Sequence, residues 1–564
     1  MAIARWPSIK KKYKIYSTQK YNTIKRIYST PQKFEDAVAE NPYQMIHVFL
    51  NKSFKQADEL VLSLFPHLEK SSTRCEWVCR EFLKKNEQKG NTRMKAKALF
   101  ELVANEYPGL SCFVFEAVTK SDMFYYDESK KIISILETYK NEKKIAEVIL
   151  EKVHSEQNYP DMKWKKYRSV DGFNLTDEQL SFLEAVCNNN IVMLSGSAGT
   201  GKTSATKALV TMLEDNFHSF TLLAPTGIAA KRLSQATGHE ASTIHRFLFS
   251  NDYIGDYLII DEMSMVGVHL LANLFNRIYP STNIIFICDE AQLASISCGN
   301  IVKDLVDSGI VPIVKLTKVF RYGIGGIATV ATDVRNGKQL SEDMEFDDFK
   351  FVPIESDPIK NVLEVYKSLL TRYDKDDIMI LSPFNVHNAG TYAINAAIQD
   401  EFNQNDVLTS YKRQSIEIQF KQGDRVINTE NNYHMQGAIE EQEIPVMNGD
   451  IGKVLGYDEY QKILKVKYDN GVAYLEPENI FKQLLGYCIS VHKSQGTQAK
   501  AVIVVIDSGH RFFLTRNLCY VAMSRAQEEL IVVGDIDAIN YSLNIQEEKR
   551  RDTWLKEFLT MEEC

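Results

Sequence analysis

The sequence lacks several features that define whole classes of protein. It has no apolar run near the roughly 20 residues that a membrane-spanning helix needs, so we expect no membrane association. Its nine cysteines include no C-x-x-C pair, and Cys75 with Cys79 has no second pair to complete a zinc site. No internal repeat or low-complexity tract is present. These absences point to an ordinary globular protein in a reducing, intracellular setting.

Acidic residues are missing from the first part of the chain. Met1–Phe34 carries nine lysines and arginines and no aspartate or glutamate, although the whole chain has a net charge of −8. The segment lacks the apolar core of a secretory signal, and it is rich in lysine where transit peptides favour arginine. We therefore interpret it as a basic tail, in the first place a solvated and poorly ordered arm. A nucleic-acid contact and a targeting peptide remain as alternatives.

The chain of 564 residues is too long for one hydrophobic core and predicts about three or four domains. From Glu35 to Tyr167, apolar residues recur at helical spacing and predict an all-helical domain. Beyond Gly172, short apolar strands alternate with helical segments, which indicates parallel sheets of the P-loop type. The expected strands are Ile191 to Leu194, Phe220 to Leu223, Tyr257 to Ile260, Asn283 to Cys288, Ile378 to Leu381, Ala501 to Ile506 and Leu530 to Val533.

The rhythm changes between Leu408 and Leu485. Short strands there are separated by turn sequences at Asn448–Asp450 and Asp469–Gly471. Turns of this kind join antiparallel strands, so we expect a small β-barrel inserted in the α/β part of the chain.

Gly196–Thr203 has the spacing of a phosphate-binding P-loop, and it lies between an expected strand and a helix-forming segment. Its glycines let backbone N–H groups close around phosphates at the start of a helix. Lys202 is placed to reach the terminal phosphate, and the Thr203 hydroxyl to hold Mg²⁺. The sequence therefore predicts binding and hydrolysis of a nucleoside triphosphate. The predicted nucleotide-binding residues of the loop are Gly196, Ser197, Ala198, Gly199, Thr200, Gly201, Lys202 and Thr203.

Two further sets of charged residues suit phosphoryl transfer. Asp261 and Glu262 follow an expected strand, where Asp261 can hold Mg²⁺ and Glu262 can orient the attacking water. Arg321 and Arg525 are candidates for the positive charge that stabilises the transition state across a cleft. An acidic pair at a strand end can instead be a surface cap, and a lone arginine is more often part of a surface ion pair.

Several segments occur in the order that the motifs of one family have. They are Leu175–Gln179 (Q motif), Ala224–Lys231 (motif Ia), Ser242–Arg246 (the next DNA-contact motif), Asp261–Val266 (motif II), Asp289–Leu293 (motif III), Arg321 (motif IV), Asn395–Gln399 (an Asn-x-x-x-Gln pattern), Val491–Gly496 (motif V) and Tyr520–Ala526 (motif VI). In these motifs the chain resembles the superfamily 1B DNA helicases, in particular the short RecD-like enzymes of bacteria and phages, and it is also similar to the Dda type. The resemblance covers most of Asn41–Asp535.

The resemblance implies an α/β fold with two tandem RecA-like P-loop domains, a small SH3-like β-barrel insertion and an N-terminal helical domain. That helical domain resembles a degenerate helix-hairpin-helix region, because Phe49–Ser53 has no glycine where a close backbone approach to a phosphate requires one. A structural role, DNA binding and partner docking stay open for it. The expected boundaries are 1–34 for the basic tail, 35–168 for the helical domain, 169–325 for the first motor domain, 326–407 with 486–545 for the second, 408–485 for the insertion and 546–564 for a C-terminal tail.

The resemblance also implies roles for single residues. The implied catalytic residues are Lys202, Glu262, Gln292, Arg321 and Arg525. Gln179 is expected to contact the adenine of ATP, and Thr203 with Asp261 to hold Mg²⁺. The implied DNA contacts are Pro225, Thr226, Thr243, His245, Asn395, His492 and Lys493.

The implied function is that of a DNA-dependent ATPase that moves 5′ to 3′ along single-stranded DNA and unwinds duplex DNA in replication, repair or recombination. We expect ATP and Mg²⁺ as cofactors, single-stranded DNA and its junctions with duplex as substrates, and a monomer in the cytoplasm of a bacterial or phage-infected cell. Replication or recombination proteins are candidate partners. A motor subunit of a recombination nuclease and an ATP-gated DNA-binding scaffold or loader are the alternatives. Only Phe247–Tyr257 is available for the β-hairpin that helps related helicases to split the duplex, so translocation is better supported than unwinding.

Overall fold

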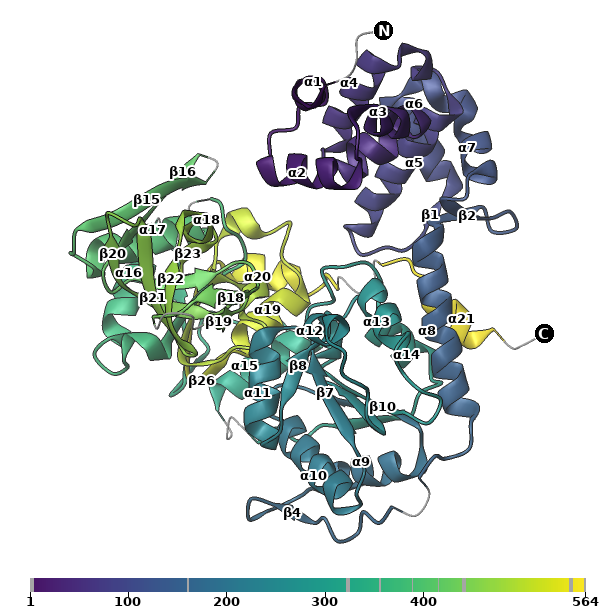
Figure 1. The fold of residues 1–564 in the computed structure, drawn as a ribbon. Coiled ribbons are helices and arrows are strands. Elements are labelled where there is room, and N and C mark those ends of the chain that lie inside the picture. Colours follow the sequence, from purple (N-terminus) through teal and green to yellow (C-terminus); the bar gives the residue numbers. More distant parts are fainter. Residues whose placement is uncertain are drawn as a thin grey trace. The chain divides into compact units, whose positions relative to one another are not determined.

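The computed structural model of the chain describes residues 5–159, 162–320, 325–354, 357–387, 389–413, 415–438, 443–546 and 551–561 (Figure 1). The chain forms two compact units. Unit 1 comprises Met1–Glu142 with Asp552–Trp554, and unit 2 comprises Lys143–Arg551 with Leu555–Cys564. Among the helices of the described ranges, none is long and apolar enough to cross a membrane.

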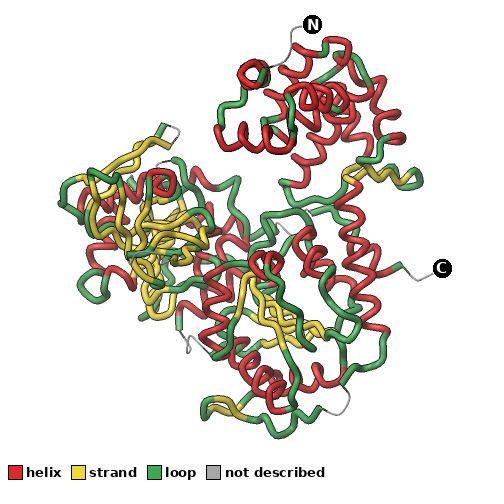
Figure 2. The backbone as a smooth tube through the Cα atoms, in the orientation of Figure 1, coloured by secondary structure: helices red, strands yellow, loops and turns green. Residues whose placement is uncertain are grey.

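Unit 1 is mainly helical (Figure 2). Its helices are α1 (Trp6–Lys12), α2 (Thr18–Ile27), α3 (Pro31–Glu40), the π-helix η1 (Gln44–Phe49), α4 (Phe54–Leu64), α5 (Ser72–Glu87), α6 (Ala96–Glu106), α7 (Val114–Lys120) and the first part of α8 (Leu136–His154). A serine or threonine side chain accepts a hydrogen bond from a backbone N–H at the start of α2, α3, α4 and α5, which stabilises these helix starts. The helices enclose a core that includes Phe34, Tyr43 and Trp77.

The segment expected to be a basic tail over 1–34 is folded wherever the structure describes it, which corrects the expectation of a poorly ordered arm. α1 and α2 bury the side chains of Ile9, Tyr13 and Ile24 in the core of unit 1. Ile9 and Tyr13 are four residues apart, so they lie on the same side of α1. The high lysine content led to the prediction of a solvated arm, but burial depends on the spacing of a few apolar residues and not on net charge.

Unit 1 also contains a three-stranded antiparallel sheet, so the expectation of an all-helical domain was wrong here. β3 (Ile132–Ile135) lies between β1 (Met94–Lys95) and β2 (Phe124–Asp127). In the turn between β2 and β3, the Asp127 carboxylate accepts a hydrogen bond from the Lys130 N–H (3.0 Å). This local contact favours a hairpin over a helix that begins before α8.

The C-terminal segment Asp552–Trp554 completes unit 1. Trp554 is 1% exposed, and its indole N–H donates a hydrogen bond to the Ser134 hydroxyl (2.6 Å). Asp552 forms an ion pair with Arg93 (2.6 Å), and its carbonyl accepts a hydrogen bond from the Thr92 N–H (2.9 Å). Part of the expected C-terminal tail therefore belongs to the N-terminal core.

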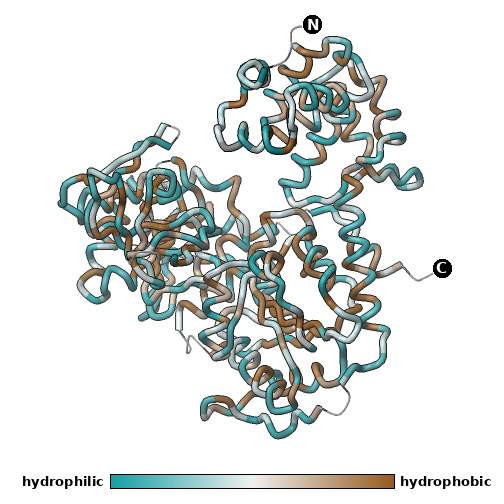
Figure 3. The backbone as a smooth tube through the Cα atoms, in the orientation of Figure 1, coloured by the Kyte–Doolittle hydropathy of each residue, from teal (hydrophilic) through white to brown (hydrophobic). Residues whose placement is uncertain are grey.

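Unit 2 contains a six-stranded parallel sheet in the order β11-β6-β10-β9-β7-β8. Its strands are β6 (Ile191–Gly196), β7 (Phe220–Ala224), β8 (Ala241–Thr243), β9 (Tyr257–Ile260), β10 (Asn283–Cys288) and β11 (Ile313–Leu316). Accompanying helices are α9 (Asp177–Asn188), α10 (Lys202–Asp215), α11 (Gly227–Thr237), α12 (Ile244–Phe249), α13 (Val268–Phe275), α14 (Ile301–Ser308) and α21 (Leu555–Thr560). Figure 3 shows hydrophobic residues along β7 and β10. The four strands expected in this region are confirmed, since each is an apolar run buried between helices.

A second six-stranded sheet has the order β12-β13-β26-β25-β14-β24, and all neighbours except β12 and β13 are parallel. Its strands are β12 (Glu345–Phe346), β13 (Phe349–Pro353), β14 (Ile378–Ser382), β24 (Cys488–Ser490), β25 (Ala499–Ile506) and β26 (Ala526–Gly534). The helices of this part are α15 (Gly326–Asn336), α16 (Pro358–Leu369), α17 (Thr391–Phe402), α19 (Arg516–Met523) and α20 (Ile536–Ser542). The three strands expected here are confirmed. Two such α/β sheets fit RecA-like P-loop domains.

Antiparallel β-structure lies between α17 and β24. Five strands form a sheet in the order β22-β21-β20-β17-β23, and two hairpins pair β15 with β16 and β18 with β19. The strands are β15 (Val407–Arg413), β16 (Ile416–Lys421), β17 (Arg425–Asn428), β18 (Asn432–Gln436), β19 (Glu443–Val446), β20 (Ile451–Asp458), β21 (Ile463–Tyr468), β22 (Gly471–Leu475) and β23 (Gln483–Leu485). Gly449 (φ +95°) and Gly471 (φ +139°) occupy the two expected turns.

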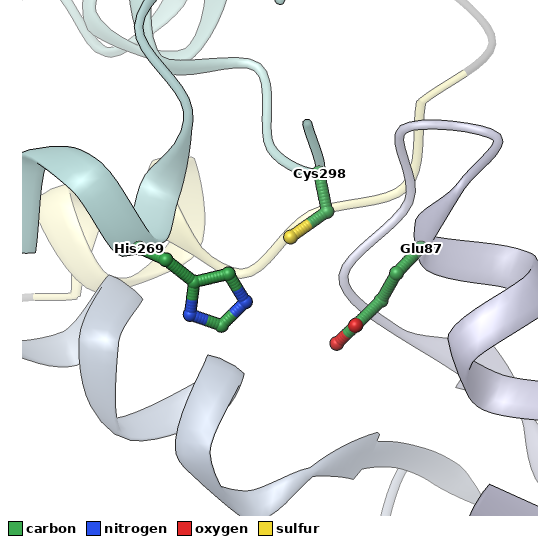
Figure 4. Close-up of side chains that lie close together, drawn as sticks. All are labelled: Glu87, His269 and Cys298. Carbon is green, nitrogen blue, oxygen red and sulfur yellow. The ribbon is translucent and has the colours of Figure 1, made fainter. Parts of the chain in front are cut away.

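Three side chains with metal-ligand chemistry are drawn in Figure 4. In unit 2, His269 of α13 and Cys298 place their potential ligand atoms within 4.8 Å of each other. In unit 1, the carboxylate of Glu87 accepts a hydrogen bond from the Thr138 hydroxyl. A histidine and a cysteine alone fall short of the four ligands of a structural zinc site.

Candidate nucleotide site and nucleic-acid track

The P-loop lies between the buried strand β6 and helix α10. Gly199 and Gly201 have φ values of +81° and +83°, which only glycine adopts without strain. A Cβ atom on Gly201 would lie 2.5 Å from the Gln179 amide nitrogen. The loop sequence is therefore required both by the backbone conformation and by the space beside it.

The side chain of Lys202 folds back over the P-loop. Its ammonium group donates hydrogen bonds to the carbonyls of Gly196 (2.5 Å) and Ser197 (3.2 Å). Thr203 follows at the first turn of α10 and is exposed. A cation and a hydroxyl thus lie at a helix N-terminus, where backbone N–H groups favour an anion.

One cavity of about 640 Å³ brings the predicted catalytic residues together. It has the size of a small-molecule pocket. Its lining includes Ser197, Ala198, Gly199, Gly201, Lys202, Thr203, Arg232, Asp261, Glu262, Gln292, Phe320 and Arg525. Four of the five predicted catalytic residues line it, and the fifth, Arg321, lies outside the described residues.

The carboxylates of Asp261 and Glu262 come directly after β9. Burial and the neighbouring charge of Glu262 raise the pKa of Asp261, while Lys202 and Arg232 act in the opposite direction. Glu262 has φ +50°, and its N–H donates to the Asp261 carboxylate (2.8 Å). A half-buried carboxylate beside a second one suits a divalent cation, because the cation would relieve their repulsion.

Gln292 follows β10 and is 6% exposed. Its side-chain oxygen is buried and accepts no hydrogen bond within the described part of the chain. Burying an acceptor without a donor is costly. A γ-phosphate-bound water or a nucleotide hydroxyl in the cavity would supply the missing donor.

Arg525 reaches the same cavity from the second sheet. Only 3% of this residue is exposed, and its guanidinium donates to the carbonyls of Val521 (2.9 Å) and Thr497 (3.4 Å). These contacts are all made within the second α/β part, so they hold the guanidinium in a fixed position at the edge of the nucleotide cavity.

Two residues of α19 that were not among the predicted site residues connect the two sheets. The Tyr520 hydroxyl donates to the Asp289 carboxylate (2.7 Å) and accepts from the Ala198 N–H of the P-loop (3.2 Å). The Asn517 amide donates to the carbonyls of Ala291 (3.1 Å) and Gln292 (3.3 Å). Tyr520 stands in the segment already assigned to motif VI, and a polar residue three positions earlier on the same helix face was the available signal for Asn517.

Family models and known proteins match the part of the chain that contains this cavity. A family model described as an AAA domain matches residues 174–350, and one described as a UvrD-like helicase C-terminal domain matches residues 485–533. The chain is 29% identical over 392 residues to the ATP-dependent RecD2 DNA helicase of Deinococcus radiodurans, which covers 68% of this chain and 52% of that protein. It is 34% identical over 174 residues to the ATP-dependent DNA helicase dda of Enterobacteria phage T4, covering 26% and 38% of the two chains. These matches support the resemblance of the chain to the superfamily 1B, RecD-like helicases.

The extent of the similarity is partial. The chain spans about half the length of its RecD2 relative. A Pif1 helicase from Bacteroides, solved with ADP-AlF3 and single-stranded DNA, is 20% identical, with 64% of this chain and 92% of that chain covered at a TM-score of 0.42. The resemblance to RecD-like helicases therefore rests on the sequence matches.

The Q-motif residue of this RecD-like chain is engaged with the protein itself. Gln179 forms a capping box with Thr176 at the start of α9, and its side-chain oxygen accepts from the Thr176 N–H (2.9 Å). Its amide nitrogen donates to the Gly201 carbonyl (3.0 Å). These contacts tie α9 to the P-loop. Contact with adenine stays a prediction for this residue.

The threonines and histidines predicted to contact DNA differ in exposure. Thr226 and Thr243 are the N-caps of α11 and α12, where their hydroxyls accept from the N–H groups of Ala229 (3.2 Å) and Arg246 (3.1 Å). Helix starts of this kind present backbone N–H groups that suit phosphates. The remaining predicted residues here are His245 and His492, both exposed, and Pro225, half-buried.

Asn395 has a structural role that the sequence analysis did not foresee. It is 4% exposed, and its amide both donates to the Cys488 carbonyl (2.7 Å) and accepts from the Cys488 N–H (2.9 Å). Gln399, one helical turn later, donates to the Asp424 carboxylate (2.5 Å). The pattern holds α17 against β24 and the base of the insertion. A DNA contact by the buried Asn395 amide is therefore corrected to a packing contact.

Lys493 follows β24 and lies near Arg413 at the end of β15. Burial and the charge of Arg413 lower the pKa of Lys493 to about 8. Two neighbouring cations repel each other unless an anion lies between them. This pair is consistent with the predicted contact of Lys493 with a DNA phosphate.

The segment expected to form a short β-hairpin is a loop. The structure assigns no strand between α12 and β9 in residues 250–256. The Arg277 guanidinium donates to the carbonyls of Phe247 (2.6 Å) and Ser250 (3.1 Å), and the Gly255 N–H donates to the Thr221 hydroxyl (3.0 Å). These contacts replace the cross-strand hydrogen bonds that a hairpin would need.

Proposed function

We propose that this RecD-like chain is an ATP-driven motor that moves 5′ to 3′ along single-stranded DNA and unwinds duplex DNA. The observation that carries the proposal is the single cavity shared by the P-loop, the two carboxylates after β9, Gln292 and Arg525. Binding phosphate needs only the first of these. Hydrolysis coupled to movement also needs groups from a second domain, and Arg525 is such a group.

The proposed chemistry divides among the residues that line the cavity. Lys202 and the loop N–H groups bind the phosphates, Glu262 orients the attacking water, and Arg525 stabilises the charge that develops on the transferred phosphoryl group. Thr203 and Asp261 offer a hydroxyl and a carboxylate in the same cavity, which fit Mg²⁺. A bound Mg²⁺ would neutralise phosphate charge. Arg321 is proposed as a second arginine from its place in the sequence alone.

Coupling of hydrolysis to movement is proposed to depend on α19. The Tyr520 hydroxyl accepts a hydrogen bond from a P-loop N–H group, and the Asn517 amide donates to the carbonyls of Ala291 and Gln292. A nucleotide that rearranges the P-loop must therefore disturb the contacts of α19. The second sheet then shifts relative to the first. The DNA contacts proposed at Thr226, Thr243 and His492 form and break in turn.

The finer parts of the architecture are proposed on the same basis. We assign the antiparallel strands of 408–485 to an SH3-like barrel, 169–325 to the first RecA-like domain, and 326–407 with 486–545 to the second. The helical region 35–168 is proposed as a degenerate helix-hairpin-helix-like domain. In support, Asn51 has φ +54° in the turn after η1, so asparagine takes the left-handed conformation that glycine would usually supply.

The loop between α12 and β9 is the proposed strand-splitting element. Phe249 and Tyr253 are 90% and 81% exposed on or beside this loop, and Arg277 holds its backbone. Exposed aromatic rings on a fixed loop can stack on a terminal base pair. The double variant Phe249→Ala/Tyr253→Ala should lose most unwinding and keep its DNA-stimulated ATPase. Tyr460→Ala, a fully exposed tyrosine of the insertion, is the control.

A strand-displacement assay with 5′-tailed and 3′-tailed duplexes tests the proposed function. With ATP we expect unwinding of the 5′-tailed duplex only. Unwinding of the 3′-tailed duplex alone would overturn the polarity. DNA-stimulated ATP hydrolysis without displacement of either duplex would leave a translocase and reject unwinding.

A further inference from the structure

The N-terminal helices of unit 1 carry positive charge that the protein does not neutralise. Of the nine lysines and arginines in Met1–Phe34, only Lys12 forms an ion pair, with Glu35 (2.6 Å), among the residues that the structure describes. The other 530 residues of the chain contain 57 basic and 74 acidic residues. The overall charge of the protein, which is acidic, does not account for a local cluster of unpaired lysines and arginines.

These cations converge on aromatic rings. The ammonium groups of Lys10 and Lys25 lie 5.4 and 4.7 Å from the centre of the Tyr21 ring. Lys20 lies 4.8 Å from the centre of the Phe49 ring. α1, α2 and the end of η1 therefore contribute to one surface.

A lysine from the turn after η1 extends this surface. The Lys52 ammonium group donates to the Lys14 carbonyl (2.9 Å) and lies 5.7 Å from the centre of the Tyr16 ring, which is 83% exposed. Burial and the charge of Lys14 lower the pKa of Lys52, so a nearby anion would stabilise its charged form. We call Lys10, Lys14, Lys20, Lys25 and Lys52, with Tyr16, Tyr21 and Phe49, the basic face.

We propose that the basic face of unit 1 binds the phosphate backbone of DNA, with Tyr16 available to stack on a base. Lysine ammonium groups contact phosphates as point charges without reading sequence, and interleaved aromatic rings suit single strands. The choice of DNA as the polyanion rests on the proposed function. The face would give unit 1 a DNA contact made by its own residues, separate from those of the nucleotide cavity.

We expect side chains to make this contact, because the three backbone N–H groups of the neighbouring turn are already paired. The N–H groups of Leu50, Asn51 and Lys52 donate to the carbonyls of Met45 (2.9 Å), Val48 (3.1 Å) and His47 (3.1 Å). The binding strength should therefore depend on the number of lysines and on salt. Phosphate binding by backbone N–H groups would depend less on the number and type of the basic side chains.

The test compares two triple variants of the full chain with the same change in charge. Lys10→Gln/Lys20→Gln/Lys25→Gln removes helical residues of the basic face, and glutamine keeps the helix propensity. Lys70→Gln/Lys97→Gln/Lys120→Gln removes three lysines elsewhere on unit 1, two of which pair with Glu101 and Glu116. Binding to labelled single-stranded DNA is measured without nucleotide over a range of salt concentrations.

We expect the basic-face variant to bind at least about tenfold more weakly at low salt, with a log–log salt slope smaller by about 2, since each single-strand phosphate contact contributes about 0.7. The control variant should stay within about twofold of the wild type, and the arginine version of the basic-face variant should keep the slope. Equal slopes for the two glutamine variants would overturn the proposal. If the triple variant fails to fold, Lys25→Gln alone should lower the slope by about 0.7.

Two further measurements separate the basic face from the motor and from other anionic partners. At saturating DNA the basic-face variant should keep its maximal ATPase rate. A wild type without DNA-stimulated ATPase would reject the proposed motor function, while the slope comparison would still decide the basic face. Binding of the wild type to phosphatidylserine vesicles but not to DNA would overturn the proposal in favour of a membrane surface.

Discussion

The two parallel sheets of unit 2 contribute to the nucleotide cavity in different ways. The first sheet presents its groups from strand carboxyl ends: the P-loop after β6, Asp261 after β9 and Gln292 after β10. The second sheet reaches the same cavity with Arg525, which lies just before β26, while Tyr520 on α19 contacts the P-loop and Asp289 beside it. Only the first sheet follows the common rule for ligands in α/β proteins.

This difference separates binding from coupling. Groups at strand ends are fixed by the sheet itself, so the first sheet forms a phosphate site without the second. The groups of the second sheet reach the nucleotide only while the two sheets keep their mutual position. Substitutions in the first sheet should therefore weaken nucleotide binding as well as hydrolysis, and those in the second should change turnover and DNA dependence. The following predictions test this division.

Lys202→Ala should have the largest effect, because it removes the cation at the terminal phosphate. We expect ATP hydrolysis to fall at least about 100-fold, with weaker nucleotide binding. Steady-state ATPase with a fluorescent nucleotide titration measures both. Lys207→Ala on the same helix, which loses only a surface ion pair with Asp171, is the control. Unchanged DNA-stimulated ATPase in Lys202→Ala would contradict the assigned site.

Arg525→Ala should lower turnover at least roughly tenfold and leave nucleotide affinity largely intact, because a transition-state contact affects the rate more than ground-state binding. Single-turnover ATPase with a binding titration separates the two quantities. Arg525→Lys keeps the charge but not the fork of donors, so it should recover only part of the rate. A loss of affinity as large as the loss of rate would place Arg525 with the first sheet.

Tyr520→Phe should uncouple the two sheets without removing a catalytic group. Loss of a hydrogen bond to a buried carboxylate should lower the free energy of unfolding by about 1.5–3 kcal/mol. We expect part of this free-energy loss to weaken the coupling between the two sheets. DNA stimulation of the ATPase should therefore fall about three- to tenfold. The control is Tyr468→Phe, which loses a buried hydroxyl contact with Gln483 (2.7 Å) inside the insertion. If both variants lose DNA stimulation equally, the effect comes from stability and not from α19.

Lys493 should give the smallest effect, a dependence of DNA affinity on pH. Its pKa is lowered to about 8, so the free protein loses this charge as the pH rises through about 8, while DNA phosphate favours the charged form. Affinity for single-stranded DNA should therefore fall about two- to fivefold between pH 7 and pH 9, the size of one weak ionic contact. Lys493→Arg should remove the dependence. An identical pH profile in that variant would assign the titration to another group.

Four of the six strands of the first sheet and three of the six strands of the second were predicted from the sequence. The expected strands at β6, β7, β9 and β10 are continuous apolar runs, and such runs remain strands in almost any parallel sheet. The short β8 and β11 carry no such run. The order of the strands depends on pairing between segments far apart in the sequence, such as Phe349 with Leu530. The reach of α19 to the P-loop depends on the contact of Tyr520 with Ala198, more than 300 positions away.

The corrections have the same origin. The basic N-terminal segment was judged by its charge, whereas Ile9 and Ile24 fix it in unit 1. A DNA contact was predicted for Asn395 from its place in a motif, whereas its amide is hydrogen-bonded to the backbone of Cys488. Arg321 lies outside the described residues, so its role stays a prediction.

The sequence by itself determined the phosphate-binding loop, the carboxylates after β9 and the resemblance to RecD-like helicases, because these depend on local spacing and on backbone conformations that only glycine adopts at Gly199 and Gly201. The tertiary structure alone decided which distant groups meet: Tyr520 with Asp289, Trp554 with Ser134, and the lysines of α1 and α2 around Tyr21. The physical reason is that local conformation follows from neighbours in the chain, whereas burial and hydrogen-bond partners follow from contacts formed only after the domains have packed.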